Sequence, residues 1–263
     1  MRLVFLGDVV GEPGREAIKQ AVPKFIDKWG PDFIVVNGEN AAGGKGITPK
    51  LAYELLRAKI DVITLGDHCW DQREIQGFFE EEPRLIRPFN FPDNSPGKGW
   101  VRVHGNGKKL AVINALGRTF MPFPVDNPFS GIDELLLEVK KETPCVLVDF
   151  HAETTSEKIA FGHHCDGKVS AVLGTHTHVQ TADEKVLEKG TAYITDVGFC
   201  GPHDSVIGRD KKVIVDRFLT LMHSRMPVAT SGNQADGVML EIDDDTGKAI
   251  SIQRIQESVE DGL

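Results

Sequence analysis

Two histidines, separated by one threonine, follow an apolar run in the second half of the chain. The run at 169–173 leads directly into His176 and His178, so both imidazoles come after a segment typical of a buried strand. Imidazoles are common metal ligands, but histidines of this kind also occur on surfaces and in cores. The role of the pair therefore depends on what else the chain places beside it.

The same arrangement recurs at four other apolar runs. Each run is rich in Val, Ile, Leu or Phe and is followed by a carboxylate, an amide or an imidazole. Because ligands bind at the carboxyl edge of open α/β sheets, groups that follow several strands are expected to share one site. The candidate site residues are Asp8, Glu39, Asn40, Asp67, His68, His151, His176 and His178.

These candidate ligands favour transition-metal chemistry. They comprise carboxylates, an amide and imidazoles without an obligatory thiolate, which is the donor mixture of Mn, Fe, Zn, Co or Ni sites. Carboxylates packed together repel each other unless cations neutralise them, and this many donors exceeds what one ion needs. Two ions that share a bridging carboxylate fit the set better than a single ion.

Segments with helical spacing lie between several of the apolar runs, and this alternation predicts a layered α/β sheet in a single domain, residues 1–263. The expected helices span 15–29, 49–58 behind a Thr48 cap, 72–82 behind a capping box of Asp71 and Glu74, and about 212–222. Hairpins are expected at 101–116, turning at Asn106-Gly107, and at 238–255, turning near Gly247. Residues 83–99 are expected to form a long surface loop.

The composition is that of a folded, acidic protein. The 263 residues include 30 Lys and Arg against 39 Asp and Glu, a net charge of −9 without a basic run, so no stable nucleic-acid complex is expected. Asp8 interrupts the first apolar run and no later stretch reaches membrane-spanning length, which predicts a cytoplasmic protein without membrane contact. The scattered cysteines, without a CxxC pair, are expected to be reduced, buried thiols: Cys69, Cys145, Cys165 and Cys200.

The strand-end motifs resemble those of the calcineurin-like metallophosphoesterase superfamily. The resemblance is carried by Gly7-Asp8, Gly38-Glu39-Asn40, Gly66-Asp67-His68, His151 and Gly174-Thr175-His176-Thr177-His178. The segments NGENAAGGKG (37–46), INALGRTFMP (113–122), DFHAETTSEK (149–158) and TDVGFCGPHDSVIG (195–208) are similar to its YmdB-type branch. That resemblance implies an α/β/β/α sandwich of two mixed sheets flanked by helices. It also implies a phosphodiesterase of small phosphoesters, cyclic nucleotides such as 2′,3′-cyclic AMP foremost.

The resemblance further implies two metal ions, iron or manganese first, with zinc, cobalt or nickel as alternatives. One ion would be held by Asp8, Glu39, Asn40 and His178, and the other by Glu39, Asp67, His151 and His176, with Glu39 as the bridge. Such a pair lowers the pKa of a shared water and stabilises charge on phosphorus. His68 would stabilise a phosphate oxygen or protonate the leaving alkoxide.

Two positions depart from the superfamily pattern. Val10 stands where the first motif carries a histidine, and the branch suggests Asn40 as the substitute ligand. Asp67 stands where the superfamily and the branch carry Asn. An additional carboxylate there is expected to bind a cation more tightly while weakening its Lewis acidity.

The candidate substrate contacts are Lys45, Arg118 and His203. For Lys45 and Arg118 the alternative is an ordinary solvated cation on a loop. Phe120 and Phe129 could stack on a nucleobase, although core packing is the commoner role of Phe.

Four further polar residues are expected outside the set of candidate ligands. His163 and His164 are expected in a solvated polar loop. Asp183 and Asp196 are expected either to support a site histidine or to cap a turn.

Three classes of function remain open at this point. The first is the small-phosphodiester hydrolase, and the second is a phosphomonoesterase or nuclease that uses the same metals. The third is a regulatory protein in which the metal site is structural. A homo-oligomer is compatible with each of them.

Overall fold

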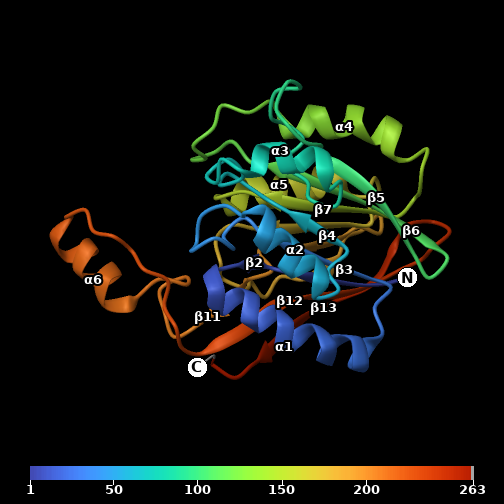
Figure 1. Cartoon of the computed structure of the whole chain (residues 1–263). Coiled ribbons are helices and arrows are strands. Elements are labelled where there is room, and N and C mark those ends of the chain that lie inside the picture. Colours follow the sequence, from blue (N-terminus) through green and yellow to red (C-terminus); the bar gives the residue numbers. More distant parts are fainter. Residues whose placement is uncertain (262–263) are drawn as a thin grey trace.

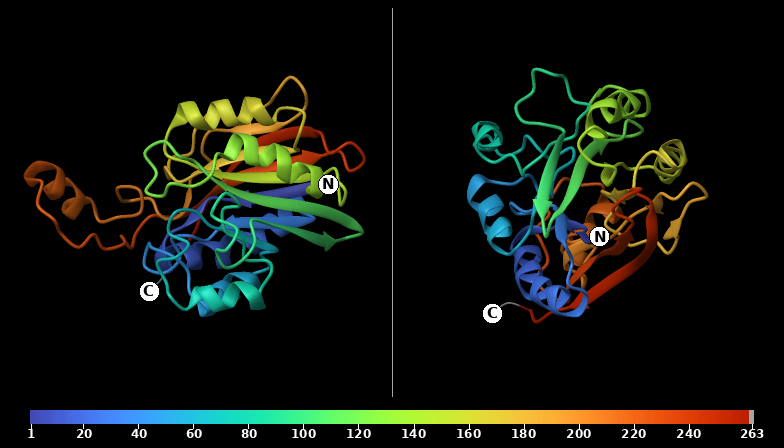
Figure 2. Two further views of the ribbon diagram at one scale, coloured as in Figure 1. Left: turned by 90° about the horizontal axis from the view of Figure 1, so that it is seen from above. Right: turned by 90° about the vertical axis from the view of Figure 1, so that its right-hand side faces the viewer.

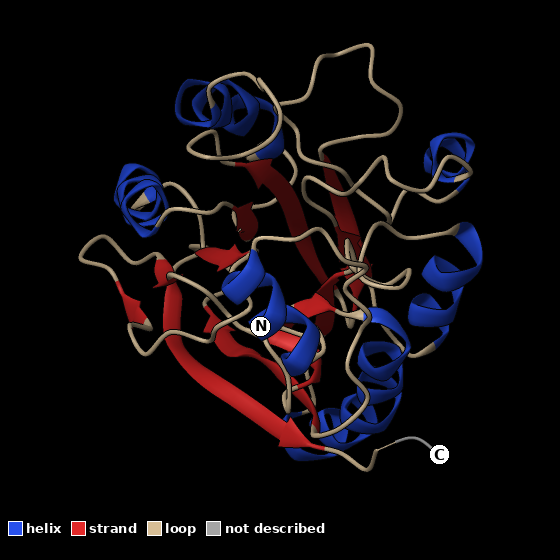
Figure 3. Cartoon of the chain, turned by 90° about the vertical axis from the view of Figure 1, so that its left-hand side faces the viewer, coloured by secondary structure: helices blue, strands red, loops and turns tan. Residues whose placement is uncertain are grey.

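Two β-sheets pack face to face, and helices cover their outer faces (Figure 1). The computed structural model describes residues 1–261. Figure 2 shows the layers from two further directions, and Figure 3 shows strands in the interior with helices around them, apart from one long strand that lies at the surface. The expected α/β/β/α sandwich with two mixed sheets is confirmed.

The first sheet has the strand order β2-β11-β12-β1-β3-β4, with β13 paired to β12. Strands β1, β3 and β4 are parallel, whereas β12 runs antiparallel to β1, so the sheet is mixed. Its strands are β1 (Arg2–Leu6), β2 (Asp8–Val9), β3 (Phe33–Asn37), β4 (Val62–Thr64), β11 (Phe199–Pro202), β12 (Asn233–Ile242) and β13 (Ala249–Ser258).

The second sheet has the order β5-β6-β7-β8-β10-β9. Its four inner strands are parallel, and an antiparallel strand lies at each edge. Its strands are β5 (Trp100–Gly105), β6 (Lys108–Leu116), β7 (Val146–His151), β8 (Ala171–Thr175), β9 (Lys185–Val186) and β10 (Ala192–Ile194).

Three apolar layers hold the sandwich together. The central layer joins the two sheets, with Phe5 and Val35 from the first facing Leu147 and Leu173 from the second. The outer layers join the first sheet to α1 (Gly11–Trp29), α2 (Pro49–Arg57) and α3 (Ile75–Glu81), and the second sheet to α4 (Pro128–Val139) and α5 (Thr155–Cys165). The remaining helix, α6 (Lys211–Thr220), projects away from the body of the protein (Figure 1).

Three helices differ in their bounds from the sequence-based prediction. Helix α1 begins at Gly11, before the expected residue 15. Gly11 itself has a positive φ of 63°, which glycine adopts readily. Helix α3 begins at Ile75, and the capping box of Asp71 and Glu74 is wrong because the Asp71 carboxylate pairs with the ring of His68 instead. Helix α6 begins at Lys211 and ends two residues before the expected end.

The expected loop around His163 and His164 is also wrong, because both residues lie in the last turn of α5. Phe161 and Cys165 of this helix are buried against the second sheet, and Gly162 gives the ring of Tyr193 room to pack against the helix. His164 lies 3.1 Å from a carboxylate oxygen of Asp133.

Other expectations are confirmed. The β5–β6 hairpin turns at Asn106-Gly107, both with positive φ, and β12 and β13 form the second hairpin. The four cysteines are buried free thiols. Over residues 1–261, none of the helices combines the length and the apolar character that a bilayer crossing requires.

Removing the Phe5 ring should destabilise the sandwich. Phe5 is fully buried between the sheets, so Phe5→Ala should lower the free energy of unfolding by about 3–5 kcal/mol through lost burial and a residual cavity. Denaturant unfolding measures this difference. Phe120→Ala, at a ring that is 86% exposed, is the control and should change stability by less than about 1 kcal/mol. Equal losses for both variants would contradict the assigned core.

Candidate metal centre

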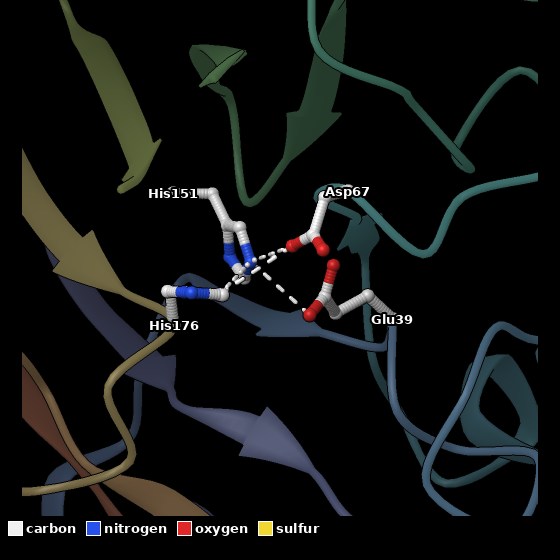
Figure 4. A group of neighbouring side chains, drawn as sticks. All are labelled: Glu39, Asp67, His151 and His176. Carbon is white, nitrogen blue, oxygen red and sulfur yellow. Dashed lines mark hydrogen bonds and ion pairs between the residues drawn. The ribbon is translucent and has the colours of Figure 1, made fainter. Parts of the chain in front are cut away.

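The polar residues that follow the strands of both sheets converge at one edge of the sandwich. In the first sheet, β3 and β4 run parallel and are followed by Glu39 and Asp67. In the second sheet, His151 ends β7 and lies opposite Thr175, the last residue of β8. Because the two sheets pack face to face, the carboxylates of one meet the imidazoles of the other (Figure 4).

Four of these residues form a tight cluster: Glu39, Asp67, His151 and His176, each offering a ligand atom within 4.8 Å of the others. The His151 Nε2 atom lies 3.1 Å from Glu39 Oε1 and 3.2 Å from Asp67 Oδ1. His176 Nδ1 lies 2.9 Å from the same His151 nitrogen and 3.4 Å from Asp67 Oδ1. This is the set that the family resemblance implied for one of the two ions.

The remaining candidate ligands adjoin this cluster through Glu39. Asn40 Nδ2 donates to Glu39 Oε1 at 3.0 Å and lies 3.3 Å from His178 Nε2. The same His178 nitrogen is 3.6 Å from Asp8 Oδ1. Asp8, Asn40 and His178 thus lie together on one side of Glu39, as the second expected set requires.

The electrostatics of the cluster are those of buried, mutually compensating charges. Burial by itself raises the pKa of Asp8, but the charge and hydrogen bonding of His178 outweigh it and lower that pKa below the ordinary range. For Asp67, hydrogen bonds to His151 and His176 likewise outweigh burial and lower the pKa. Burial lowers the pKa of His151, but the negative charges of Glu39 and its neighbours raise it well above its usual value.

This donor set fits transition-metal cations. Asp8, Glu39 and Asp67 are buried close together, so their charges require compensation from within the site. The raised pKa values of His151 and His178 favour protonated rings that supply part of this compensation, and cations can replace those protons. Three carboxylates, three imidazoles and the side-chain amide of Asn40 provide enough groups for two ions, and none of them is a thiolate.

A buried polar network holds the His151 ring. Its Nδ1 atom lies 2.9 Å from the hydroxyl of Thr175, which donates to Asp149 Oδ1 at 2.7 Å. The other Asp149 oxygen accepts hydrogen bonds from Asn37 and Thr64. Burial raises the pKa of Asp149 to about 6. The network fixes the ring so that Nε2 faces the carboxylates of the first sheet.

The loop that carries the other two histidines has an unusual backbone. His176 and His178 both adopt positive φ, 95° and 61°, a conformation that residues other than glycine rarely take. Asp196 restrains the residue between them, because its Oδ2 atom accepts hydrogen bonds from the Thr177 amide at 3.1 Å and the Thr177 hydroxyl at 2.7 Å. The same oxygen accepts a 2.8 Å hydrogen bond from Lys158, and both partners of this ion pair are buried.

The structure places His68 beside the cluster. Its Nδ1 atom pairs with Asp71 at 3.1 Å, its Nε2 atom is 4.0 Å from Asp67 Oδ2, and its amide donates to Glu39 Oε2. The ring is partly exposed, with 28% of the side chain accessible, so a solvent-borne molecule can reach it.

The expected substrate contacts are more dispersed. Lys45 and Arg118 are exposed on loops that follow β3 and β6. The His203 ring stacks on Phe199, which stacks on His178, and its Nε2 atom pairs with Asp236 at 3.1 Å. These three roles stay predictions.

The other expected supporting residues divide by their contacts. Asp196 supports the histidine loop, whereas Asp183 binds the hydroxyl groups of Thr181 and Thr195 and so braces a turn. Phe129 packs edge-on against Phe161, which agrees with core packing, the alternative to nucleobase stacking.

Sequence reasoning missed three residues around the site. Glu153 lies 3.0 Å from His176 Nε2, Lys158 pairs with Asp196, and Asp149 supports His151 through Thr175. Asp149 and Glu153 each lie two residues from His151, so proximity in the chain was a usable signal. Lys158 offered no such signal, because lysines are almost always exposed.

An α/β/β/α sandwich with carboxylates and imidazoles gathered at the strand ends of both sheets is a metallophosphoesterase architecture. Within this class, the chain belongs to the YmdB-like protein family, whose profile matches residues 4–255. Over 255 residues it is 53% identical to the 2′,3′-cyclic-nucleotide 2′-phosphodiesterase of Bacillus subtilis (strain 168), covering 97% of this chain and 96% of that protein. The family resemblance inferred from the motifs is confirmed.

Two solved structures are also similar over nearly their whole length. A novel phosphatase from Mycoplasma pneumoniae superposes with a TM-score of 0.92 at 38% identity, covering 99% of this chain and 94% of that one. A hypothetical protein from Thermus thermophilus superposes with a TM-score of 0.91 at 40% identity, covering 98% of this chain and 99% of that one.

Breaking the buried ion pair should destabilise the protein. Lys158→Met leaves the Asp196 carboxylate buried without its cation, which should lower the free energy of unfolding by about 3–5 kcal/mol. Denaturant unfolding provides the measurement, and Lys50→Met at an exposed lysine is the control. The double variant Lys158→Met/Asp196→Leu should regain part of the loss, since no unpaired charge remains. A single variant as stable as the wild type would contradict the ion pair's role.

Proposed function

We propose that this protein is a metal-dependent phosphodiesterase that hydrolyses small phosphodiesters, with 2′,3′-cyclic nucleotides as the leading substrates. The observation that carries the proposal is the buried cluster of Glu39, Asp67, His151 and His176 at the strand ends. The activity named for the Bacillus subtilis relative, at 53% identity over nearly the whole chain, supports this choice of substrate over a phosphomonoester or a nucleic-acid polymer.

Within this proposal, two ions are held by the two sets of side chains that meet at Glu39. Asp8, Glu39, Asn40 and His178 form one set, and Glu39, Asp67, His151 and His176 form the other. Such ions, when bound, supply an acidified water as nucleophile and neutralise charge on the phosphoryl group. The chain contributes fixed ligand positions, because Asp149 orients His151 and Asp196 restrains the histidine loop.

His68 is proposed as the proton donor to the leaving alkoxide. Its Nδ1 atom is paired with Asp71, which fixes the orientation of the ring and leaves Nε2 on the side of Asp67 and the cluster. The partly exposed ring can contact substrate and exchange protons with solvent. Since an alkoxide is a strongly basic leaving group, a positioned acid contributes substantially to its departure.

Metal uptake should release protons. The pKa of His151 and that of His178 are both raised, so these rings hold protons that an incoming ion must displace. Affinity for Mn²⁺ or Fe²⁺ should therefore fall as the pH falls. Calorimetric titration in buffers of different ionisation enthalpy measures the metal affinity and the number of protons released.

Replacing Asp67 by Asn removes one carboxylate from the cluster. In Asp67→Asn, one of the two binding steps should therefore weaken by about tenfold or more.

Uptake of at most one ion would contradict the dinuclear arrangement. Binding without proton release would contradict the assignment of protons to His151 and His178. Removal of the metal by a chelator should abolish hydrolysis of 2′,3′-cyclic AMP, and added metal should restore it. Activity that survives chelation would overturn the proposed chemistry.

Replacing His68 should separate catalysis from metal binding. His68→Ala should retain the metal content of the wild type and lower kcat for 2′,3′-cyclic AMP by about 10²-fold or more. An ester with a more acidic leaving group, such as bis(4-nitrophenyl) phosphate, should lose much less, because it requires no proton donor. The exposed residue His104 of β5, on the edge of the second sheet, supplies the control variant His104→Ala. Equal losses on both substrates would exclude His68 as the acid, and unchanged turnover would favour a structural metal site.

A further inference from the structure

The segment that follows β6 makes a tight turn beside the candidate metal centre. Its start is tied to a proposed ligand, because the amide of Gly117 donates to the carbonyl oxygen of His151 at 2.9 Å. The backbone then reverses at residues 118–121, which are closed by a 3.4 Å hydrogen bond from the last amide to the first carbonyl oxygen. Phe120 is the third residue of this turn and is 86% exposed.

Glu157 of α5 clamps the first half of the turn. One of its carboxylate oxygens accepts a 2.9 Å hydrogen bond from the Arg118 amide, and the other accepts a 3.1 Å hydrogen bond from the Thr119 amide. The far side is anchored by packing, because Met121 and Phe123 lie against the outer apolar layer of the first sheet. The turn is thus held at both ends although its tip faces solvent.

Aromatic contacts place the same turn near His68. The Phe123 ring packs edge-on against Phe91, with the ring centroids 5.4 Å apart, and Phe91 packs edge-on against Trp70 at 5.7 Å. Trp70 is two residues from His68. The chain therefore runs from the end of β7 toward the segment that carries His68, and the turn lies at the rim of the site between them.

The conformation of Phe120 is costly for an exposed apolar residue. Its φ of 61° lies in the left-handed region, at a turn position where glycine or asparagine is usual. Glycine would adopt this conformation without strain, and a ring so exposed gains little from burial. The stability of the fold therefore does not account for a phenylalanine here, and retained strain of this kind points to function.

We propose that Phe120 is the platform on which the nucleobase of the substrate stacks, and that Glu157 positions it. This inference rests on the proposed function, because a 2′,3′-cyclic nucleotide carries its base on C1′, next to the carbon that bears the 2′-oxygen. A nucleotide whose leaving oxygen lies at His68 extends its base toward the rim of the site. Every base has a π-face, so an exposed aromatic ring binds it by stacking.

Steady-state kinetics of the metal-loaded enzyme on two cyclic esters tests this role. One is 2′,3′-cyclic AMP, and the other is methyl riboside 2′,3′-cyclic phosphate, which lacks a base. Phe120→Ala should raise KM for 2′,3′-cyclic AMP by about tenfold with kcat nearly unchanged, because it removes a contact with the base alone. KM for the base-free ester should stay the same, and Phe120→Trp should retain the low KM for 2′,3′-cyclic AMP.

A glycine variant separates stacking from a structural role. Phe120→Gly relieves the backbone strain, so its Tm should equal or exceed that of the wild type while KM for 2′,3′-cyclic AMP rises as in Phe120→Ala. Leu137→Ala, at a side chain 74% exposed on α4, is the control and should leave both kinetic constants unchanged. The metal content of every variant should match that of the wild type.

Glu157→Gln tests the clamp, because a side-chain amide offers one acceptor oxygen to the two backbone donors. It should raise KM for 2′,3′-cyclic AMP by less than Phe120→Ala does. In the double variant it should add nothing to the effect of Phe120→Ala, since both changes act through one ring. Additive losses would overturn the positioning role of Glu157.

The outcomes distinguish this inference from the proposed function. If the wild type hydrolyses 2′,3′-cyclic AMP and Phe120→Ala leaves its KM unchanged, or raises KM equally for both esters, the inference alone is overturned. If the wild type does not hydrolyse 2′,3′-cyclic AMP, the proposed function fails, and calorimetric binding of 3′-AMP decides the inference. Phe120→Ala should then weaken this binding by about tenfold. Absent binding, or binding that the variant does not weaken, overturns the stacking role.

Discussion

The burial of three carboxylates at the meeting point of two sheets is the constraint on which this site depends. Asp8, Glu39 and Asp67 are almost inaccessible to solvent, so water cannot screen their mutual repulsion. The second sheet supplies imidazoles that compensate this negative charge, from β7 and from the loop after β8. Compensation therefore crosses the interface between the sheets, and the apolar layer that joins them also sets the distances between ligands.

A second layer of buried polar groups maintains those distances. Asp149 acts through a hydroxyl on His151, and the Lys158–Asp196 ion pair acts through the Thr177 backbone on a loop whose histidines have positive φ. Strain of this kind persists only where surrounding contacts over-determine the conformation. The absence of glycine at both positions indicates that the side chains are required there, because glycine would adopt these angles without strain.

The alternation of strands and helices predicted a layered α/β sheet, and the convergence of strand ends at one edge gathered the candidate ligands. The division into two sheets was implied only by the family resemblance. The sequence predicted helix bounds less well where tertiary contacts determine them. Asp71 and Glu74 have the spacing of a capping box, but Asp71 is used by His68, which no local pattern reveals. The residues of α5 show no clear apolar stripe, since a buried lysine and a glycine occupy its inner face, so part of the helix resembled a polar loop.

The residues that lead into the projecting helix α6 contact the candidate metal centre directly. His178 Nδ1 lies 3.1 Å from the carbonyl oxygen of Ile207, and Arg209 binds the carbonyl oxygen of Gly44, whose amide in turn donates to the backbone of Asn40. His178 and Asn40, two members of one proposed ligand set, are thus braced by the residues just before α6. Ile207 itself has a positive φ of 47°. The histidine loop after β8 is therefore restrained from two directions, by Asp196 within the sandwich and by Ile207 ahead of α6.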